Sequence, residues 1–340
     1  RQRQMCIRDR TEWTIPTAGS YPYGIAVSGG LIYFTEGSGD KIGRLDPSTG
    51  VFTEWTIPTV DASPYGIAVS GGYVYFTEQG TANKIGRLDP AIGVFTEWTI
   101  PTGPFSNPYG ITVSGGLVYF TEYDIQANKI GRLDPTTGVF TEWTIPTASS
   151  YPTDIAVSGG LVYFTEYWPA NKIGRLDPAT GVFTEWTVPT AGSPHGIAVS
   201  GGIIYFTEVA NAANKIGRLD PSTSVFTEWT IPTASSGPSY IAVSGGLVYF
   251  TEKNGNKIGC LDPSTGVFTE WTPPTAGSGP YGIAVSSGLI YFTEIGGNKI
   301  GRLTISPVAT TTTYVSKTIS TATTTSGIST ASSTYLSMST

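Results

Sequence analysis

Carboxylates and one histidine are the residues of this sequence best suited to acid–base or metal chemistry. A glutamate ends the motif Y-F-T-E, which recurs every 42 to 44 residues, at Glu36, Glu78, Glu122, Glu166, Glu208, Glu252 and Glu294. Seven carboxylates gathered around one axis would raise one another's pKa values or bind a cation such as Mg²⁺ or Ca²⁺. The alternative is a solvated ion pair within each repeat, such as Glu36 with Lys41 or Glu166 with Lys172.

A second group of candidates is aromatic and lies where the repeats differ from one another. Tyr123, Tyr167 and Trp168 stand directly after two of the Y-F-T-E motifs, where the other repeats have no aromatic residue. Aromatic side chains beside polar groups are typical of ligand sites. The alternative is that these side chains only pack the loops that carry them. The candidate binding residues are Phe105, Tyr109, Tyr123, Tyr151, Asp154, Tyr167, Trp168 and His195, the one histidine.

The elements that must position these residues follow from the repeat. Each unit has four short segments of the type G-I-A-V, L-I-Y-F-T-E, K-I-G-R-L-D and V-F-T-E-W-T-I. Their β-branched and aromatic residues favour strands, and the S-G-G, D-P-S-T-G and P-T between them favour turns. Four strands in 42 to 44 residues is the period of a propeller blade. We therefore predict an all-β fold, a seven-bladed β-propeller of four-stranded antiparallel blades.

The two ends of the repeat region complete one blade. Residues 11–16 are an isolated fourth strand, T-E-W-T-I-P, and the last unit, residues 281–305, lacks its fourth strand. Pairing the N-terminal strand into the last blade closes the ring and covers two open sheet edges. The propeller is therefore expected to span residues 11–305.

The ends of the chain share nothing with the repeat. Residues 1–10 contain four arginines, lack the apolar segment of a secretory signal peptide, and are expected to be extraneous. Residues 306–340 are rich in Ser and Thr without apolar periodicity, which predicts a disordered tail. Such tails often carry O-linked glycans outside the cell. We therefore expect an extracellular or cell-surface protein, with a plain flexible linker as the alternative reading of the tail.

Composition excludes several classes of function. A net charge of -6 and a pI near 4.9 give no basic surface for nucleic acid, and no apolar run is long enough to span a bilayer. Cys6 and Cys260 are too few for a disulfide framework or a zinc site.

The variation among the repeats is predicted to fall on one face of the ring. The S-G-G and D-P-S-T-G turns share one face and are nearly uniform, whereas the loops after Y-F-T-E and between blades share the other and vary. Loops on a rigid scaffold commonly bind ligands. We expect a monomer that binds a peptide, glycan or protein partner through this variable-loop face.

The frame P-x-G-I, Y-F-T-E, N-K-I-G-R and T-E-W with P-T resembles the streptogramin B lyase (virginiamycin B lyase) family throughout residues 11–305. The resemblance implies a seven-bladed propeller that binds Mg²⁺ and opens a cyclic peptide antibiotic by elimination across an ester. It also implies a histidine in the P-x-G-I position of one blade and a Glu-x-His ending at that position of the next. The glutamate of the following F-T-E would be a metal ligand.

Only part of this pattern is present. His195 in P-H-G-I matches the first histidine and would be the catalytic residue, and Glu208 or Glu252 would hold the Mg²⁺. Ser239 stands at the position of the second histidine, and Gly237 stands at that of the glutamate two residues earlier. The resemblance therefore covers the scaffold better than the chemistry.

Two functions remain open at this stage. If blade count sets the register instead, the two positions hold Ser239 and Tyr281, and no histidine remains. Elimination needs a base for the proton beside the carbonyl and an acid for the leaving group. The first expectation is therefore a non-catalytic or diverged propeller with no certain cofactor. The alternative is a Mg²⁺-dependent enzyme that opens a cyclic depsipeptide by C–O elimination.

Overall fold

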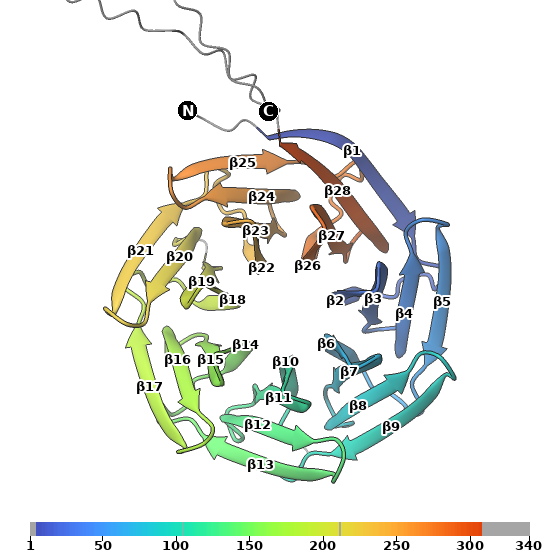
Figure 1. The fold of residues 1–340 in the computed structure, drawn as a ribbon, viewed down its shortest axis with the longest axis vertical. Helices are drawn as coiled ribbons and strands as arrows, with labels where there is room; N and C mark the ends of the chain where they lie inside the picture. The colour runs from blue at the N-terminus through green and yellow to red at the C-terminus, as the bar shows by residue number, and fades with distance from the viewer. Residues whose placement is uncertain (1–4, 104, 211, 308–340) are drawn as a thin grey trace, which may run out of the picture. The chain divides into compact units, whose positions relative to one another are not determined.

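The computed structural model describes residues 5–103, 105–210 and 212–307, and these form seven four-stranded sheets arranged in a ring (Figure 1). In each sheet the strands pair antiparallel, from the innermost strand at the axis to the outermost. This confirms the predicted seven-bladed β-propeller. Among the described residues, no helix is long and apolar enough to cross a membrane.

The blades follow one another along the chain. Blades 1 to 3 comprise β2 (Pro22–Ser28), β3 (Leu31–Glu36), β4 (Lys41–Asp46) and β5 (Val51–Thr56); β6 (Pro64–Ser70), β7 (Tyr73–Glu78), β8 (Lys84–Asp89) and β9 (Val94–Thr99); and β10 (Pro108–Ser114), β11 (Leu117–Glu122), β12 (Lys129–Asp134) and β13 (Val139–Thr144). Blades 4 and 5 comprise β14 (Pro152–Ser158), β15 (Leu161–Glu166), β16 (Lys172–Asp177) and β17 (Val182–Thr187); and β18 (Pro194–Ser200), β19 (Ile203–Glu208), β20 (Lys215–Asp220) and β21 (Val225–Thr230). Blades 6 and 7 comprise β22 (Pro238–Ser244), β23 (Leu247–Glu252), β24 (Lys257–Asp262) and β25 (Val267–Trp271); and β26 (Pro280–Ser286), β27 (Leu289–Glu294), β28 (Lys299–Pro307) and β1 (Met5–Thr14).

Two short turns per blade make the uniform face. In blade 1, Ser28 pairs with Leu31 across Gly29 and Gly30, whose φ angles of 58° and 78° suit the two-residue hairpin that glycine favours. The D-P-S-T-G turn is held by its aspartate, because Asp46 Oδ1 accepts hydrogen bonds from the amide and hydroxyl of Ser48 at 2.9 and 2.6 Å. The variable loops are left on the opposite face.

The hydrophobic cores lie between neighbouring blades. Phe76 of blade 2 is fully buried and packs in one cluster with Tyr33 and Ile42 of blade 1. Gly86 lies opposite Phe76 across β7 and β8, and a Cβ there would come within 2.2 Å of the ring. The glycine of K-I-G-R therefore makes room for the phenylalanine of Y-F-T-E, in every repeat.

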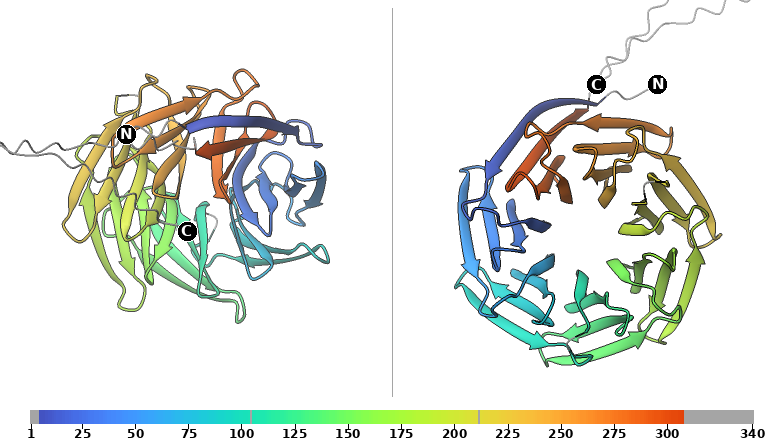
Figure 2. Two further views of the ribbon diagram at one scale, coloured as in Figure 1. Left: turned by 45° about the horizontal axis from the view of Figure 1, so that its top comes forward. Right: turned by 180° about the vertical axis from the view of Figure 1, so that it is seen from behind.

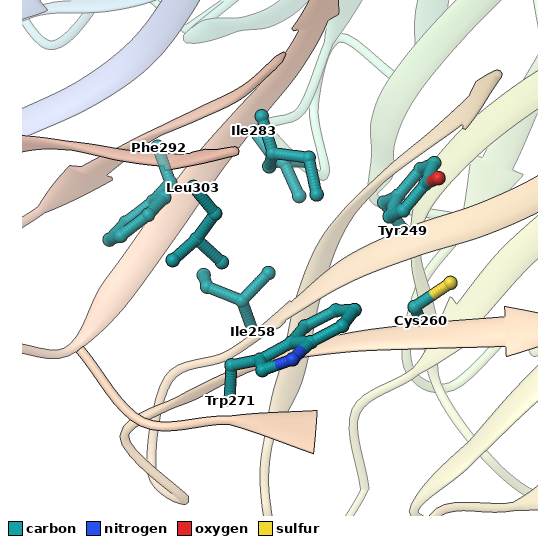
Figure 3. Close-up of a cluster of buried hydrophobic side chains, with 8 residues drawn as sticks. Tyr249, Ile258, Cys260, Trp271, Ile283, Phe292 and Leu303 are labelled. Carbon is teal, nitrogen blue, oxygen red and sulfur yellow. The ribbon is translucent and has the colours of Figure 1, made fainter. Parts of the chain in front are cut away.

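Blade 6 departs from the others on its outer side. In blade 1 an arginine covers the tryptophan of T-E-W, with the Arg44 guanidinium 5.3 Å from the Trp55 ring centre. Cys260 replaces that arginine in blade 6 and is a buried free thiol. Trp271 is only 7% exposed and packs in the cluster that joins blades 6 and 7, with Leu303 (Figure 3).

The ring closes through β1, which lies along the outer edge of β28 in blade 7 (Figures 1 and 2). Thr11 pairs with Arg302 and Thr14 with Lys299, so T-E-W-T takes the fourth-strand place. Glu12 Oε1 accepts a hydrogen bond from the Thr275 amide at 2.9 Å, which ties in the connection from blade 6. The predicted closure is confirmed.

Both closing strands run beyond the predicted bounds of the propeller. β1 begins at Met5 and β28 ends at Pro307, whereas the sequence predicted 11–305. The pairing continues past a bulge between Ile7 and Asp9 because β28 still offers backbone partners there. Residues 5–10, predicted to be extraneous, therefore belong to blade 7. The predicted tail lies outside the described residues from residue 308 onward.

Candidate functional site

The P-x-G-I positions bring seven side chains together at the axis. The glycine lets neighbouring inner strands approach, since a Cβ at Gly24 would lie 2.5 Å from the carbonyl oxygen of Tyr65. The threonine of Y-F-T-E bridges the same strands: Thr35 Oγ1 accepts from the Gly24 amide and donates to the Tyr65 carbonyl, both at 2.9 Å. The residues that precede the glycine position around the ring are Tyr23, Tyr65, Tyr109, Thr153, His195, Ser239 and Tyr281.

Four of these residues, Tyr23, Tyr65, Tyr109 and Tyr281, form what we call the tyrosine cluster. The Tyr65 hydroxyl is hydrogen-bonded to those of both Tyr109 and Tyr281, and the hydroxyls of Tyr109 and Tyr281 are 3.1 Å apart. The rings of Tyr23 and Tyr65 stack with centres 4.7 Å apart. Burial raises the pKa of Tyr65 and Tyr109 well above the usual value, so the cluster is neutral.

His195 is a member of this hydrogen-bond network. Its Nδ1 lies 3.2 Å from the Ser239 carbonyl oxygen, and its Nε2 lies 3.1 Å from the Tyr109 hydroxyl. A carbonyl oxygen can only accept, so Nδ1 carries the proton and Nε2 accepts from Tyr109. Burial lowers the pKa of His195 to about 4, against the Ser239 hydrogen bond, which raises it. The imidazole is therefore neutral, and both of its nitrogens are bonded within the protein.

Asp154 lies in the axial channel, at the glycine position of blade 4. Its carboxylate accepts hydrogen bonds from the amides of Ile155 and Ile197, each at 2.9 Å, and so joins blades 4 and 5. Burial raises the pKa of Asp154 to about 7, although both amide hydrogen bonds lower it. Asp154 and Tyr240 line a channel of about 160 Å³ whose other walls are Gly and Ile of the P-x-G-I motifs.

A separate pocket of about 220 Å³ opens on the variable-loop side, next to His195. It includes Ser239, where the blade has a hydroxymethyl group in place of a tyrosine ring. Loop residues close its sides, and the Lys253 amide donates to the Gly237 carbonyl at 3.2 Å. The lining residues are Tyr167, His195, Val209, Gly237, Ser239, Lys253, Asn254 and Tyr281.

The structure brings most of the predicted aromatic residues together and leaves two outside. Tyr123 stacks on Tyr109 at 5.3 Å and is followed by Tyr151 at 5.3 Å, while Tyr167 lies 6.3 Å from the His195 ring. Phe105 and Trp168 are 51% and 62% exposed and line neither the channel nor the pocket.

Sequence reasoning missed Tyr23, Tyr65, Tyr240, Tyr281 and Lys253. Four of them sit in or beside the P-x-G-I position of blades 1, 2, 6 and 7. The signal was available, because the closed ring places this position of every blade at the same axis. The four tyrosines are hard to single out in the sequence because they occur in the repeated part of the motif and not in the variable loops.

The predicted ion pairs between Glu36 and Lys41 and between Glu166 and Lys172 are wrong. Each lysine instead binds the glutamate of T-E-W, as Lys41 Nζ binds Glu54 Oε2 at 3.1 Å. The reason is the connection between blades: the Thr17 amide and hydroxyl also donate to Glu54, at 3.1 and 2.9 Å. That carboxylate is therefore the better-supported partner for the ammonium group.

The glutamates of Y-F-T-E are fully buried, one in each blade. Neither carboxylate oxygen of any of the seven has a hydrogen-bond partner among the described residues. Burial first, and the nearby T-E-W carboxylate second, raise the pKa of each to about 8. The predicted rise in pKa is present, but it arises within separate blades and not from a carboxylate ring at the axis.

The residues present do not fit a Mg²⁺ ion. Within residues 5–103, 105–210 and 212–307 no three His, Cys, Asp or Glu side chains lie together in a way that could hold a metal. Glu208 and Glu252 have the same buried, unpartnered carboxylate as the other five repeats, and the neighbouring Glu270 is bound to Lys257 at 2.7 Å. Nothing at Ser239 or Gly237 adds an imidazole or carboxylate ligand.

Comparison with known proteins gives consistent results. The model of the virginiamycin B lyase family matches residues 6–213 and 200–324. Virginiamycin B lyase from Staphylococcus aureus is 35% identical over 87% of this chain and 99% of its own, with a TM-score of 0.80. A streptogramin B lyase is 35% identical over 88% of this chain and 98% of its own, with a TM-score of 0.80. A catalytically inactive variant of the Staphylococcus aureus enzyme, solved with quinupristin, is 34% identical over 87% of this chain and 99% of its own, with a TM-score of 0.80. No sequence among the curated proteins matches significantly.

Proposed function

Because the chain belongs to the virginiamycin B lyase family, we propose that it keeps the family's scaffold and binds a peptide without catalysing elimination. The binding site is the pocket on the variable-loop face together with Tyr167 at its edge. A mixture of aromatic rings, a hydroxyl, an amide and an ammonium group suits a peptide, which presents apolar side chains and backbone polar groups at once.

The observation that carries this proposal is the bonding of His195. A base for elimination needs a free lone pair, and the lone pair of Nε2 accepts the Tyr109 hydroxyl while Nδ1–H donates to Ser239. The burial that lowers the pKa of His195 to about 4 further weakens it as a base near neutral pH. The ring is held as part of the wall of the site.

Selection from a displayed library of random hexapeptides tests peptide binding. We expect enriched sequences whose Kd rises at least about tenfold, or about 1.4 kcal/mol, for Tyr167→Ala, which opens the edge of the pocket. Phe105→Ala is the matched control, an exposed aromatic residue that lines neither the pocket nor the channel, and should change Kd less than about twofold. Failure to enrich any peptide, or equal losses for both variants, would contradict the proposal.

Elimination is the second candidate, favoured by the 35% identity to the Staphylococcus aureus lyase. In that reaction a base removes the proton from the threonine Cα, a Cα=Cβ double bond forms as the bond between the threonine Cβ and the ester oxygen breaks, and the proton ends on the leaving carboxylate. The ring-opened product has the mass of the substrate, because no water is added.

Incubation with quinupristin and Mg²⁺ decides between the two. We expect turnover at least about 10²-fold slower than that of the Staphylococcus aureus enzyme, the lower end of what a lost acid–base group costs. Liquid chromatography separates the ring-opened isomer of equal mass. Mg²⁺-dependent product that disappears in His195→Ala would establish the enzyme and overturn the non-catalytic proposal.

A further inference from the structure

The pocket lies beside Ser239, where blade 6 has a small side chain in place of a tyrosine. At the corresponding position blades 1, 2, 3 and 7 have the tyrosine cluster and blade 5 has His195, whereas blades 4 and 6 have the small buried residues Thr153 and Ser239. The rings of His195 and Tyr281, which flank this position, contact each other edge to face with their centres 6.2 Å apart. Tyr240 contacts both of them but lines the channel and not the pocket. The space between Ser239 and the variable loops is therefore not filled by Tyr240 and forms the pocket.

The charge at this pocket is positive and unpaired. Every other lysine of the described residues forms an ion pair with a T-E-W glutamate. Lys253 forms no ion pair with a described residue; its ammonium group lies 5.2 Å from the ring centre of Tyr281, and its side chain lines the pocket. The residues that line the pocket include no Asp or Glu. The positive charge also disfavours a second cation there, and it contributes to keeping His195 neutral.

We propose that this pocket binds an aromatic carboxylate, with the ring beside Ser239 and the carboxylate on Lys253 Nζ. The ring would meet the edges of His195 and Tyr281, as the residues of the tyrosine cluster meet one another. A single ammonium group matches a singly charged carboxylate better than a doubly charged phosphate, which commonly uses several donors. The Lys253 ammonium group would therefore favour a ligand with a negative charge over an uncharged cyclic peptide.

This inference rests on the proposed peptide-binding function and makes it more specific, since a peptide offers such a group at a C-terminal Phe or Tyr. A free aromatic acid carries the same chemistry. The two sources differ in whether the adjoining residues of a peptide add contacts with Tyr167 and Asn254 at the pocket edge.

NMR titration of the full chain with three probes tests the inference. The probes are N-acetyl-tyrosine, its uncharged amide, and a tetrapeptide that ends in tyrosine with a free carboxylate. We expect the acid to bind at least about fivefold more tightly than the amide, with the largest shifts at Ser239, Lys253 and Asn254. Tighter binding of the tetrapeptide than of N-acetyl-tyrosine identifies a peptide as the source, and equal binding identifies a free acid.

Two variants make the test decisive. Lys253→Gln should remove the preference for the acid and leave the Kd of the amide within about twofold. Ser239→Tyr restores the residue found in four other blades, fills the pocket and should abolish binding of all three probes. Equal affinity for acid and amide, a preference that survives in Lys253→Gln, or no binding by any probe would overturn the inference.

The two proposals fail in different ways. Selected peptides that depend on Tyr167 but bind equally with an amidated C-terminus would overturn the aromatic carboxylate alone. Binding of N-acetyl-tyrosine that depends on Lys253, in a protein that enriches no peptide, would overturn peptide binding alone.

Discussion

A chain that begins at Ile15 loses the cooperative melting of the propeller or melts more than about 10 °C lower, because blade 7 then lacks its outer strand. β1 supplies that strand and pairs with β28 along its length. Glu12 accepts hydrogen bonds from Thr275 Oγ1 at 2.6 Å and Lys299 Nζ at 2.8 Å, and removing it leaves Lys299 without its ion pair. The outer edge of β28 would also become available for aggregation.

Calorimetry or dye-based melting of the truncated and full-length chains measures this effect. A synthetic peptide of residues 1–14 added to the truncated chain is the control, since a folded ring with one vacant strand position should regain stability when the strand is returned. A truncated chain with an unchanged melting temperature would show that blade 7 does not depend on β1.

The protein is expected to be most stable near pH 5 and to lose more than about 15 °C of melting temperature between pH 5 and pH 9. The seven buried glutamates of Y-F-T-E have folded-state pKa values of about 8 against a reference of 4.5. Between these values the folded state binds more protons than the unfolded state, so stability falls as pH rises through 8. One pH unit of difference at each of seven groups already amounts to on the order of 10 kcal/mol.

Three glutamates of T-E-W, namely Glu12, Glu54 and Glu228, change the stability in the opposite direction. Burial raises the pKa of Glu12, Glu54 and Glu228, but hydrogen bonds from lysine and threonine outweigh burial, and the pKa of each is lowered. These glutamates stabilise the folded state above the pKa that they have in the unfolded state. This stabilisation is lost as the pH falls through their lower folded-state pKa. Stability should therefore also decline below about pH 4, the unperturbed range of a glutamate pKa.

One pair of variants separates the two series. Glu122→Gln removes a group that must ionise in a buried place, so it should raise the melting temperature at pH 9 and change it little at pH 5. Glu142→Gln breaks the ion pair with Lys129, which is 3.0 Å long, and should lower the melting temperature at both pH values. A Glu122→Gln variant that is equally destabilised at both pH values would contradict the assignment of a raised pKa.

The fold could be predicted from the sequence because local and global signals agree. Strand-forming segments, glycine turns and the isolated T-E-W-T at the start of the chain all require the same closed ring. The ends of β1 and β28 could not be predicted, because Met5 and Pro307 lie in segments that do not repeat. In these segments the backbone pairing continues, but the side chains follow no repeated pattern from which it could be predicted.

The site was only partly predictable, because its contacts join distant positions. Tyr65 and Tyr281 are 216 residues apart in the chain, and only closure of the ring brings their hydroxyls together. The ion pairs were mispredicted because Thr17, which helps to hold Glu54, belongs to the connection from the preceding blade. The extracellular or cell-surface location and the monomeric state stay predictions.

The hydrogen bonds of the tyrosine cluster also bear on how such a ring can evolve. Repeats this similar arise by copying, and the turns of the uniform face are nearly the same in every copy. The hydroxyls of Tyr65, Tyr109 and Tyr281, with His195, instead connect blades 2, 3, 5 and 7 across the axis. An eighth copy would widen the axis and part these groups. These hydrogen bonds therefore favour seven copies over eight and give blades 2, 3, 5 and 7 places that are not interchangeable.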